Sequence, residues 1–180
     1  MLILTIVVVF GFMAVEALRA ARNERTQRAA GGREPSGDVY GWMQIAYPAA
    51  FAAMFLEGFL RDGAPPRLAL AAGVLVFALG KALKWWAIVT LGRCWTFRVI
   101  VVPGTPLVRR GPYRFVRHPN YLGVIGELAG VGLLTGAVLS APMATAVFGL
   151  LISRRVDVEE RALTKAARES AGASNYQLRT

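Results

Sequence analysis

The chain is poor in cysteine, histidine and acidic residues, and it shows no internal repeat. Its one cysteine, Cys94, allows no disulfide within the chain and leaves the redox compartment unconstrained. The apolar run from Leu2 to Leu18 lacks the positive segment that begins a signal peptide, and its charges follow it instead. We therefore expect a retained membrane helix whose N-terminus lies outside the cell.

The shortage of acidic residues leaves a formal charge of +10, from 21 Lys and Arg against 11 Asp and Glu. In a soluble chain this excess would suggest a nucleic-acid partner. The composition argues against a soluble chain, because 55% of the residues are hydrophobic and the mean hydropathy is +0.45. Several apolar runs approach the roughly 20 residues that cross a bilayer. We expect an all-α, polytopic integral membrane protein surrounded by membrane lipids, with no nucleic-acid partner.

The placement of the basic residues predicts the orientation of the chain. They gather at residues 19–33, 93–117 and 154–179, whereas the short connection after the second apolar run carries only Arg61 and Arg67. By the positive-inside rule, the side that holds the three basic segments is cytoplasmic. The sequence therefore predicts a multi-pass protein of the cell (inner) membrane with a cytoplasmic C-terminus.

The apolar runs predict about five transmembrane helices. Three are expected over residues 2–18, 40–60 and 68–91, and the apolar region 119–153 should form a helical hairpin broken at Gly136. The second arm of this hairpin should continue as a cytoplasmic C-terminal helix. We expect one membrane domain (1–180), made of three N-terminal helices (1–91), a cofactor-binding and catalytic core (92–163) and a C-terminal tail (164–180).

Polar residues between and within these helices give three further expectations. The Arg- and Gly-rich segment 19–38 should be a mobile loop. Lys81 and Lys84, near the inner end of the third helix, should extend towards the cytoplasmic headgroups. Alternating residues in 96–102 predict extended structure.

The stretch "RRGPYRFVRHPNYLG", Arg109 to Gly123, carries the only histidine of the chain at the start of an apolar helix. His118 precedes Pro119, and proline favours the first turn of a helix. The free N–H groups and the dipole of such a helix end attract an anion. Arg114 and Arg117 add donors suited to a carboxylate or phosphate. Alternatively, these arginines and tyrosines simply mark the membrane interface.

Carboxylates provide two more candidate sites. Glu159 and Glu160 are adjacent on the helix that leaves the hairpin. A carboxylate can accept hydrogen bonds from both hydroxyls of a ribose. Alternatively, this helix is merely solvated, with Arg155 and Glu159 as an i,i+4 ion pair. Glu127 lies within an apolar helix, where a charge is costly and often functional. It could instead be a structural hydrogen-bond partner.

Together these residues resemble the isoprenylcysteine carboxyl methyltransferase family and its phospholipid methyltransferase relatives. The resemblance rests on "RHPNYLG" (Arg117 to Gly123), on the pair Glu159–Glu160 and on the hairpin between them. The segment "WWAIVTLGRCWTFRVIVVPGTPLVRRGPYRFVRHPNY" resembles more narrowly a bacterial subgroup associated with type III polyketide synthases. Members of that subgroup methylate long-chain alkylpyrones or alkylresorcinols and tend to carry a glutamate at the position of Glu127.

The resemblance implies S-adenosylmethionine as cofactor, bound at the cytoplasmic face, and no metal. The residues that would hold it are Arg117, His118, Pro119, Tyr121, Leu122, Gly123, Glu159 and Glu160. Catalytic roles would fall to His118, Arg155 and Glu127, and the acceptor would meet Arg155, Trp86 and Trp95. Since the long helical N-terminus of the eukaryotic members is absent and nothing marks a prenyl-protein site, we expect a small lipophilic acceptor that enters from the bilayer.

Two other functions remain open on the sequence alone. Sterol-reductase-like proteins carry a similar "RHPNY-x-G" element and use NADPH, whose phosphates would suit Arg114 and Arg117. A non-enzymatic membrane scaffold or small transporter would bind neither nucleotide and would tolerate substitution of His118.

Overall fold

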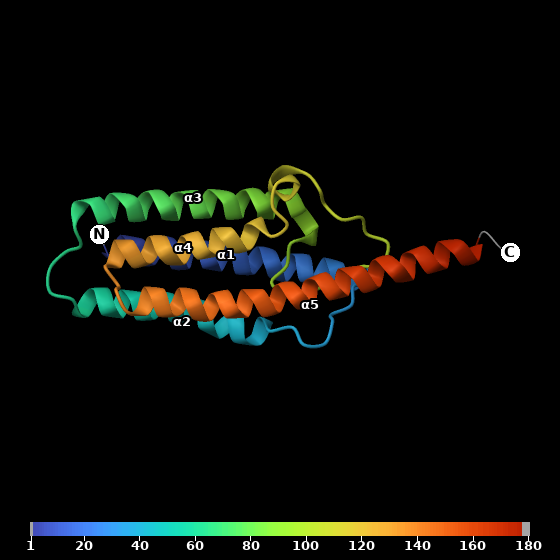
Figure 1. Cartoon of the computed structure of the whole chain (residues 1–180), viewed down its shortest axis with the longest axis horizontal. Helices are drawn as coiled ribbons and strands as arrows, with labels where there is room; N and C mark the ends of the chain where they lie inside the picture. The colour runs from blue at the N-terminus through green and yellow to red at the C-terminus, as the bar shows by residue number, and fades with distance from the viewer. Residues whose placement is uncertain (1, 178–180) are drawn as a thin grey trace.

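The computed structural model describes residues 2–177, and these residues form a helical bundle. Five α-helices run roughly alongside one another in Figure 1, and the C-terminal half of the last one projects beyond the bundle. They are α1 (Leu2–Ala29), α2 (Tyr40–Leu60), α3 (Arg67–Leu91), α4 (Pro119–Thr135) and α5 (Ser140–Gln177), with short 3₁₀ helices η1 (Gly92–Cys94) and η2 (Gly111–Arg114). Within residues 2–177 there is no strand, so the all-α prediction is confirmed.

Within residues 2–177, three helical stretches are long and apolar enough to cross a membrane: Leu2–Ala29, Tyr40–Leu60 and Arg67–Cys94, the last made of α3 and η1. Large apolar side chains point outward along them, among them Ile3, Leu56 and Leu75. A helix that is apolar on its outer face as well as its inner face suits lipid rather than water. A bundle core, which includes Phe51, Leu128 and Phe148, joins α2, α4 and α5 from the inside.

The predicted hairpin is present, and its second arm is one continuous helix of 38 residues, α5. Gly136 ends α4 in the left-handed conformation, with φ 68°, which glycine adopts without steric cost. Glu57 of α2 accepts hydrogen bonds from the backbone nitrogens of Leu139 and Ser140, at 3.0 and 2.7 Å. These bonds satisfy donors at the start of α5 that have no partner within that helix.

The helices α3 and α4 pack closely because glycines line their contact. A Cβ atom added to Gly130 would lie 2.6 Å from the backbone nitrogen of Phe77, and one added to Gly123 would lie 2.8 Å from the carbonyl oxygen of Gly80. Small residues at such a contact let the two backbones approach each other.

We expect Gly130→Ala to lower the free energy of unfolding by about 1–3 kcal/mol, because the added methyl must push α3 away. Gly149→Ala is the matched control, since no heavy atom lies within 4 Å of a Cβ added there. That control should be neutral or slightly stabilising. Unfolding of both variants in detergent tests this, and equal stability would contradict the steric explanation.

The prediction of a mobile loop over residues 19–38 is wrong for its first half. The first helix continues to Ala29, because residues 19–29 contain no Gly or Pro and are rich in Arg, Ala, Glu and Gln, which favour helices. Asn23 donates to the carbonyl oxygens of Gly92 and Trp95, at 3.0 and 2.7 Å, and Gln27 donates to that of Arg93 at 3.0 Å. The extension of α1 is therefore fastened to the segment that follows α3.

The expectation that Lys81 and Lys84 reach the headgroups is also wrong. Both are buried, and each ammonium lies between the carboxylates of Glu16 and Glu127. Lys81 Nζ is 3.0 Å from Glu16 and 2.9 Å from Glu127, and Lys84 Nζ is 2.6 and 3.4 Å from them. We call these four residues the charge ring. The apolar interior makes paired carboxylates a better partner than a distant headgroup.

Residues 96–102 do not form a strand. They bend at residues 97–98 and lie along the α1–α2 connection (residues 30–39), with which they share one antiparallel bridge between Arg33 and Val101. The backbone nitrogen of each bonds the carbonyl oxygen of the other, at 2.9 and 3.0 Å. The α1–α2 connection is therefore hydrogen-bonded to the segment that leads from α3 towards α4.

Candidate active site at the start of α4

The first feature of the site is the start of α4. Its chain enters from η2, and Pro119 occupies the first helical position, directly after His118. The rings of His118 and Tyr121 stack with their centroids 5.6 Å apart, so both lie on the same side of this helix end. The start of α4 thus sets an imidazole beside a phenol, while Pro119 has no N–H and the N–H of Tyr121 bonds the carbonyl oxygen of His118 at 3.2 Å.

The second feature is the pair of carboxylates that α5 brings to this helix end. Glu160 Oε1 lies 3.5 Å from His118 Nε2 and 3.4 Å from Arg117 Nη1. Glu159 Oε2 accepts a hydrogen bond from the Tyr121 hydroxyl at 3.1 Å and lies 3.9 Å from His118 Nδ1. Residues about 40 positions apart are therefore joined into one polar cluster, which the hairpin makes possible because it returns α5 alongside α4.

Beneath this cluster lies Arg155, whose guanidinium is buried. Its Nη1 is 2.7 Å from Asp38 Oδ1, its Nε donates to the Tyr121 hydroxyl at 2.8 Å, and its Nη2 donates to the carbonyl oxygen of Phe97. Arg155 is one of the residues predicted from the sequence, whereas Asp38 is not. The one local signal for Asp38 is its position two residues before α2, where an aspartate can accept from the backbone.

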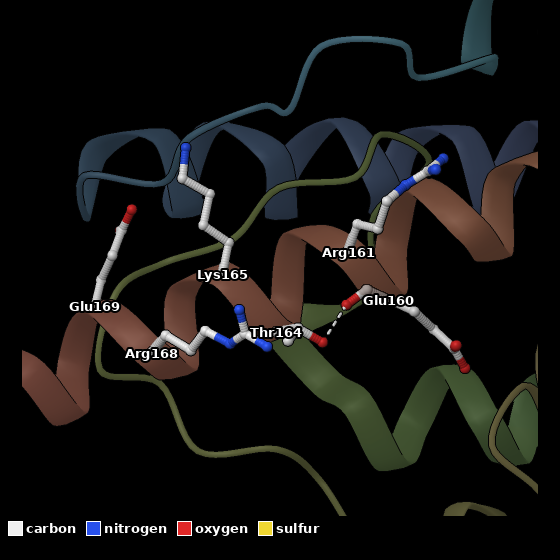
Figure 2. A pocket seen from close by; sticks show the side chains of 6 residues that line it. All are labelled: Glu160, Arg161, Thr164, Lys165, Arg168 and Glu169. Atoms are coloured by element: carbon white, nitrogen blue, oxygen red, sulfur yellow. Dashed lines mark hydrogen bonds between the residues drawn. The ribbon is translucent and has the colours of Figure 1, made fainter.

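A shallow cavity continues from the cluster along α5. It is lined by Glu160, Arg161, Thr164, Lys165, Arg168 and Glu169. Figure 2 shows the Glu160 carboxylate turned away from Lys165 and Glu169, and Thr164 donates to the carbonyl oxygen of Glu160 at 2.8 Å. All six lining residues carry a charged or hydroxyl group, and none belongs to the apolar core.

The family model for the isoprenylcysteine carboxyl methyltransferase family matches residues 72–165, just over half of the chain. The chain belongs to this family. The match includes α4, the first two thirds of α5 and the Glu159–Glu160 pair, so it covers the cluster described above.

Three relatives extend the comparison. An uncharacterized protein of Bacillus subtilis, YpbQ, is 29% identical over 150 residues, which cover 83% of this chain and 89% of that protein. An uncharacterized protein of Haemophilus influenzae is 29% identical over 126 residues, 68% of this chain and 71% of that protein. A probable protein-S-isoprenylcysteine O-methyltransferase of Oryza sativa subsp. indica is 32% identical over 94 residues, 49% of this chain and 47% of that protein. No solved structure matches.

In this member of the methyltransferase family, the structure separates the predicted site residues into two groups. One cluster holds Arg117, His118, Tyr121, Glu159 and Glu160. Arg155 contacts this cluster through the Tyr121 hydroxyl. Their roles stay predictions.

The other predicted residues lie elsewhere, or near the cluster without facing it. Glu127 belongs to the charge ring and also accepts from the Tyr47 hydroxyl at 2.5 Å. Gly123 faces α3, and Pro119 is buried. Trp95 is buried with its Nε1 donating to Asn120, whereas Leu122 and Trp86 are about half exposed.

Tyr113 lies close enough to the cluster for the charge of Glu159 to act on its phenol. Burial raises the pKa of its hydroxyl, and the nearby charge of Glu159 raises it further. This phenol therefore stays protonated near neutral pH, and it is available as a hydrogen-bond donor. A wall of neutral phenols, carboxylates and one imidazole suits a ligand with hydroxyl, amino and carboxylate groups.

Proposed function

We propose that this member of the family transfers a methyl group from S-adenosylmethionine to an oxygen of a small lipophilic acceptor. The observation that carries the proposal is the convergence of His118 and Tyr121 with Glu159 and Glu160 at one helix end, within the region that the family model matches. We take the acceptor to be an alkylpyrone, an alkylresorcinol or a similar lipid.

The residues of the cluster fit the polar parts of this cofactor. Arg117, together with the positive end of the α4 dipole, suits its carboxylate. Glu159 and Glu160 suit the two ribose hydroxyls or the amino group, because each carboxylate has two acceptor oxygens. Bound there, the cofactor would supply a methyl group activated by a positively charged sulfur.

The remaining work of the chain is positioning, because in-line transfer needs the acceptor oxygen aligned with the methyl carbon while water is excluded. A hydroxypyrone or carboxylate is already an anion near neutral pH and needs no base. A resorcinol hydroxyl has a pKa near that of tyrosine, about 10, and would gain from one. His118 is the better candidate base, because Glu127 is held between two ammonium groups.

The membrane arrangement completes the proposal. Beside the three helices that qualify as spans by length and composition, we propose that α4 and the first half of α5 also cross, giving five. With 17 residues, α4 is about 25 Å long, close to the thickness of the hydrocarbon core. The acceptor would then arrive through the lipid and the cofactor from the cytosol, where we place the C-terminus.

The test is calorimetric titration of the detergent-purified protein with S-adenosylhomocysteine and, in parallel, with NADPH. We expect binding of S-adenosylhomocysteine alone, which would justify a screen of lipid acceptors that begins with alkylpyrones. Binding of NADPH alone would assign the cluster to a reductase. Binding of neither by folded protein would overturn the proposal and leave the arginines as a membrane anchor.

A further inference from the structure

Asp38 joins three parts of the chain that are far apart in sequence. Its Oδ1 accepts from the backbone nitrogen of Tyr40 at 3.0 Å and pairs with Arg155 Nη1 at 2.7 Å. Its Oδ2 accepts from the backbone nitrogen of Val99 at 2.9 Å. One carboxylate therefore joins the start of α2, the segment after α3 and the middle of α5.

The ion pair of Asp38 and Arg155 is buried, with side-chain exposures of 5% and 7%. A buried pair of this kind is held strongly only while both charges are present, because removal of one leaves the other without compensation. Arg155 has two other partners here, the Tyr121 hydroxyl and the carbonyl oxygen of Phe97, and both are neutral.

The hydrogen bonds continue from Arg155 to the carboxylate pair in one direction. Arg155 Nε can only donate, so the Tyr121 oxygen accepts from it at 2.8 Å. The Tyr121 hydroxyl is then free to donate to Glu159 Oε2, which lies 3.1 Å away. This chain of contacts, Asp38 to Arg155 to Tyr121 to Glu159, fixes the orientation of a carboxylate at the candidate cofactor site.

The α1–α2 connection that carries Asp38 is also held by ion pairs nearer the surface. Glu34 pairs with Arg28 at 2.6 Å and with Arg98 at 2.8 Å, and these groups are partly exposed. Loss of Glu34 would therefore loosen the connection without touching Arg155. This makes Glu34→Gln a matched control for Asp38→Asn on the same segment.

We propose that Asp38 is a positioning residue for the cofactor site, acting through Arg155 and Tyr121 on Glu159; this rests on the proposed function. Without the Asp38 charge, the guanidinium loses its charged partner and no longer holds the Tyr121 hydroxyl in place. Glu159 then loses the hydrogen bond that orients its carboxylate at the cofactor site. The α1–α2 connection lies outside the region matched by the family model, and through Asp38 it controls the affinity of the cofactor site.

The experiment measures the affinity for S-adenosylhomocysteine in the full chain, in wild type, in four single variants and in one double variant. Asp38→Asn should weaken binding at least about tenfold, the usual scale for an unpaired buried charged group. Glu34→Gln should bind as wild type does, and Asp38→Glu should recover part of the loss. Tyr121→Phe removes the link, so adding Asp38→Asn to it should cause little further loss.

The outcomes separate this inference from the proposed function. Wild-type binding with unchanged affinity in Asp38→Asn would overturn the inference alone. A loss in Asp38→Asn that adds in full to that of Tyr121→Phe would overturn the route through Tyr121 and leave a general structural role. If folded wild-type protein does not bind the ligand, the proposed function fails and the inference fails with it.

Discussion

Replacing Lys84 with methionine is expected to lower the free energy of unfolding by about 3–5 kcal/mol, the usual cost of breaking a buried ion pair on one side. The charge ring explains the size of this effect. Two carboxylates and two ammonium groups alternate, and every neighbour is within 3.4 Å. Without Lys84, two buried carboxylates share one remaining ammonium, and the ring carries a net negative charge inside an apolar bundle.

A second substitution that restores neutrality should recover much of this loss. In Lys84→Met combined with Glu16→Gln, Lys81 and Glu127 remain as a pair 2.9 Å apart. The double variant should therefore be more stable than Lys84→Met alone. If the two sites were independent, the second substitution would instead add its own loss of stability. Lys165→Met, at an exposed position on α5, is the control and should change stability by less than about 0.5 kcal/mol.

Unfolding in mixed micelles, followed by circular dichroism, measures all three variants. A double variant less stable than Lys84→Met alone would show that the four groups act separately, and a Lys84→Met variant as stable as the control would show that water reaches the ring. The charge ring also joins α1 to α3 and α4. When the ring is broken, α1 should therefore be the first helix to separate from the bundle.

The sequence predicted the helices of the bundle better than the contacts between them. An apolar run of about 20 residues has few alternatives in a bilayer, so α2 and α3 begin and end within a residue of the expected positions. The sequence alone does not show where α1 ends, because the arginines of residues 19–29 suit a solvated loop and also favour a helix.

The charge ring was missed because its partners are distant in sequence, yet one signal was present. Gly73 and Gly80 lie on one face of α3, and Lys81 and Lys84 are close to that face. Small residues mark the side of a membrane helix that meets another helix. Two lysines on that side are more consistent with burial against partners than with a path to the headgroups.

The candidate site was predicted in part, for a similar reason. The His118 and Glu159–Glu160 segments were recognised by their order and spacing, which a single sequence can show. The partner of Arg155 could not be found this way, because Asp38 lies in a short connection without periodicity and 117 positions away. The i,i+4 alternative named Glu159 as that partner, whereas the arginine reaches Glu159 through Tyr121.

Alanine at His118 or at Glu160 is expected to weaken the binding of S-adenosylhomocysteine by roughly 10–100-fold, with the helices intact. Each removes one polar group that faces the start of α4, and hydrogen bonds to charged groups contribute about 1.5–3 kcal/mol. Neither side chain supports the bundle, since His118 and Glu160 contact each other, Arg117 and Tyr121 rather than the apolar core.

Glu169→Ala is the matched control for Glu160→Ala, because both carboxylates line the same cavity on α5 and only Glu160 reaches His118. Calorimetry on protein that elutes and melts as wild type does makes the comparison. Unchanged affinity in both His118→Ala and Glu160→Ala would remove the cofactor site from this helix end. A loss in Glu169→Ala equal to that in Glu160→Ala would instead place the ligand along the outer cavity, away from the imidazole.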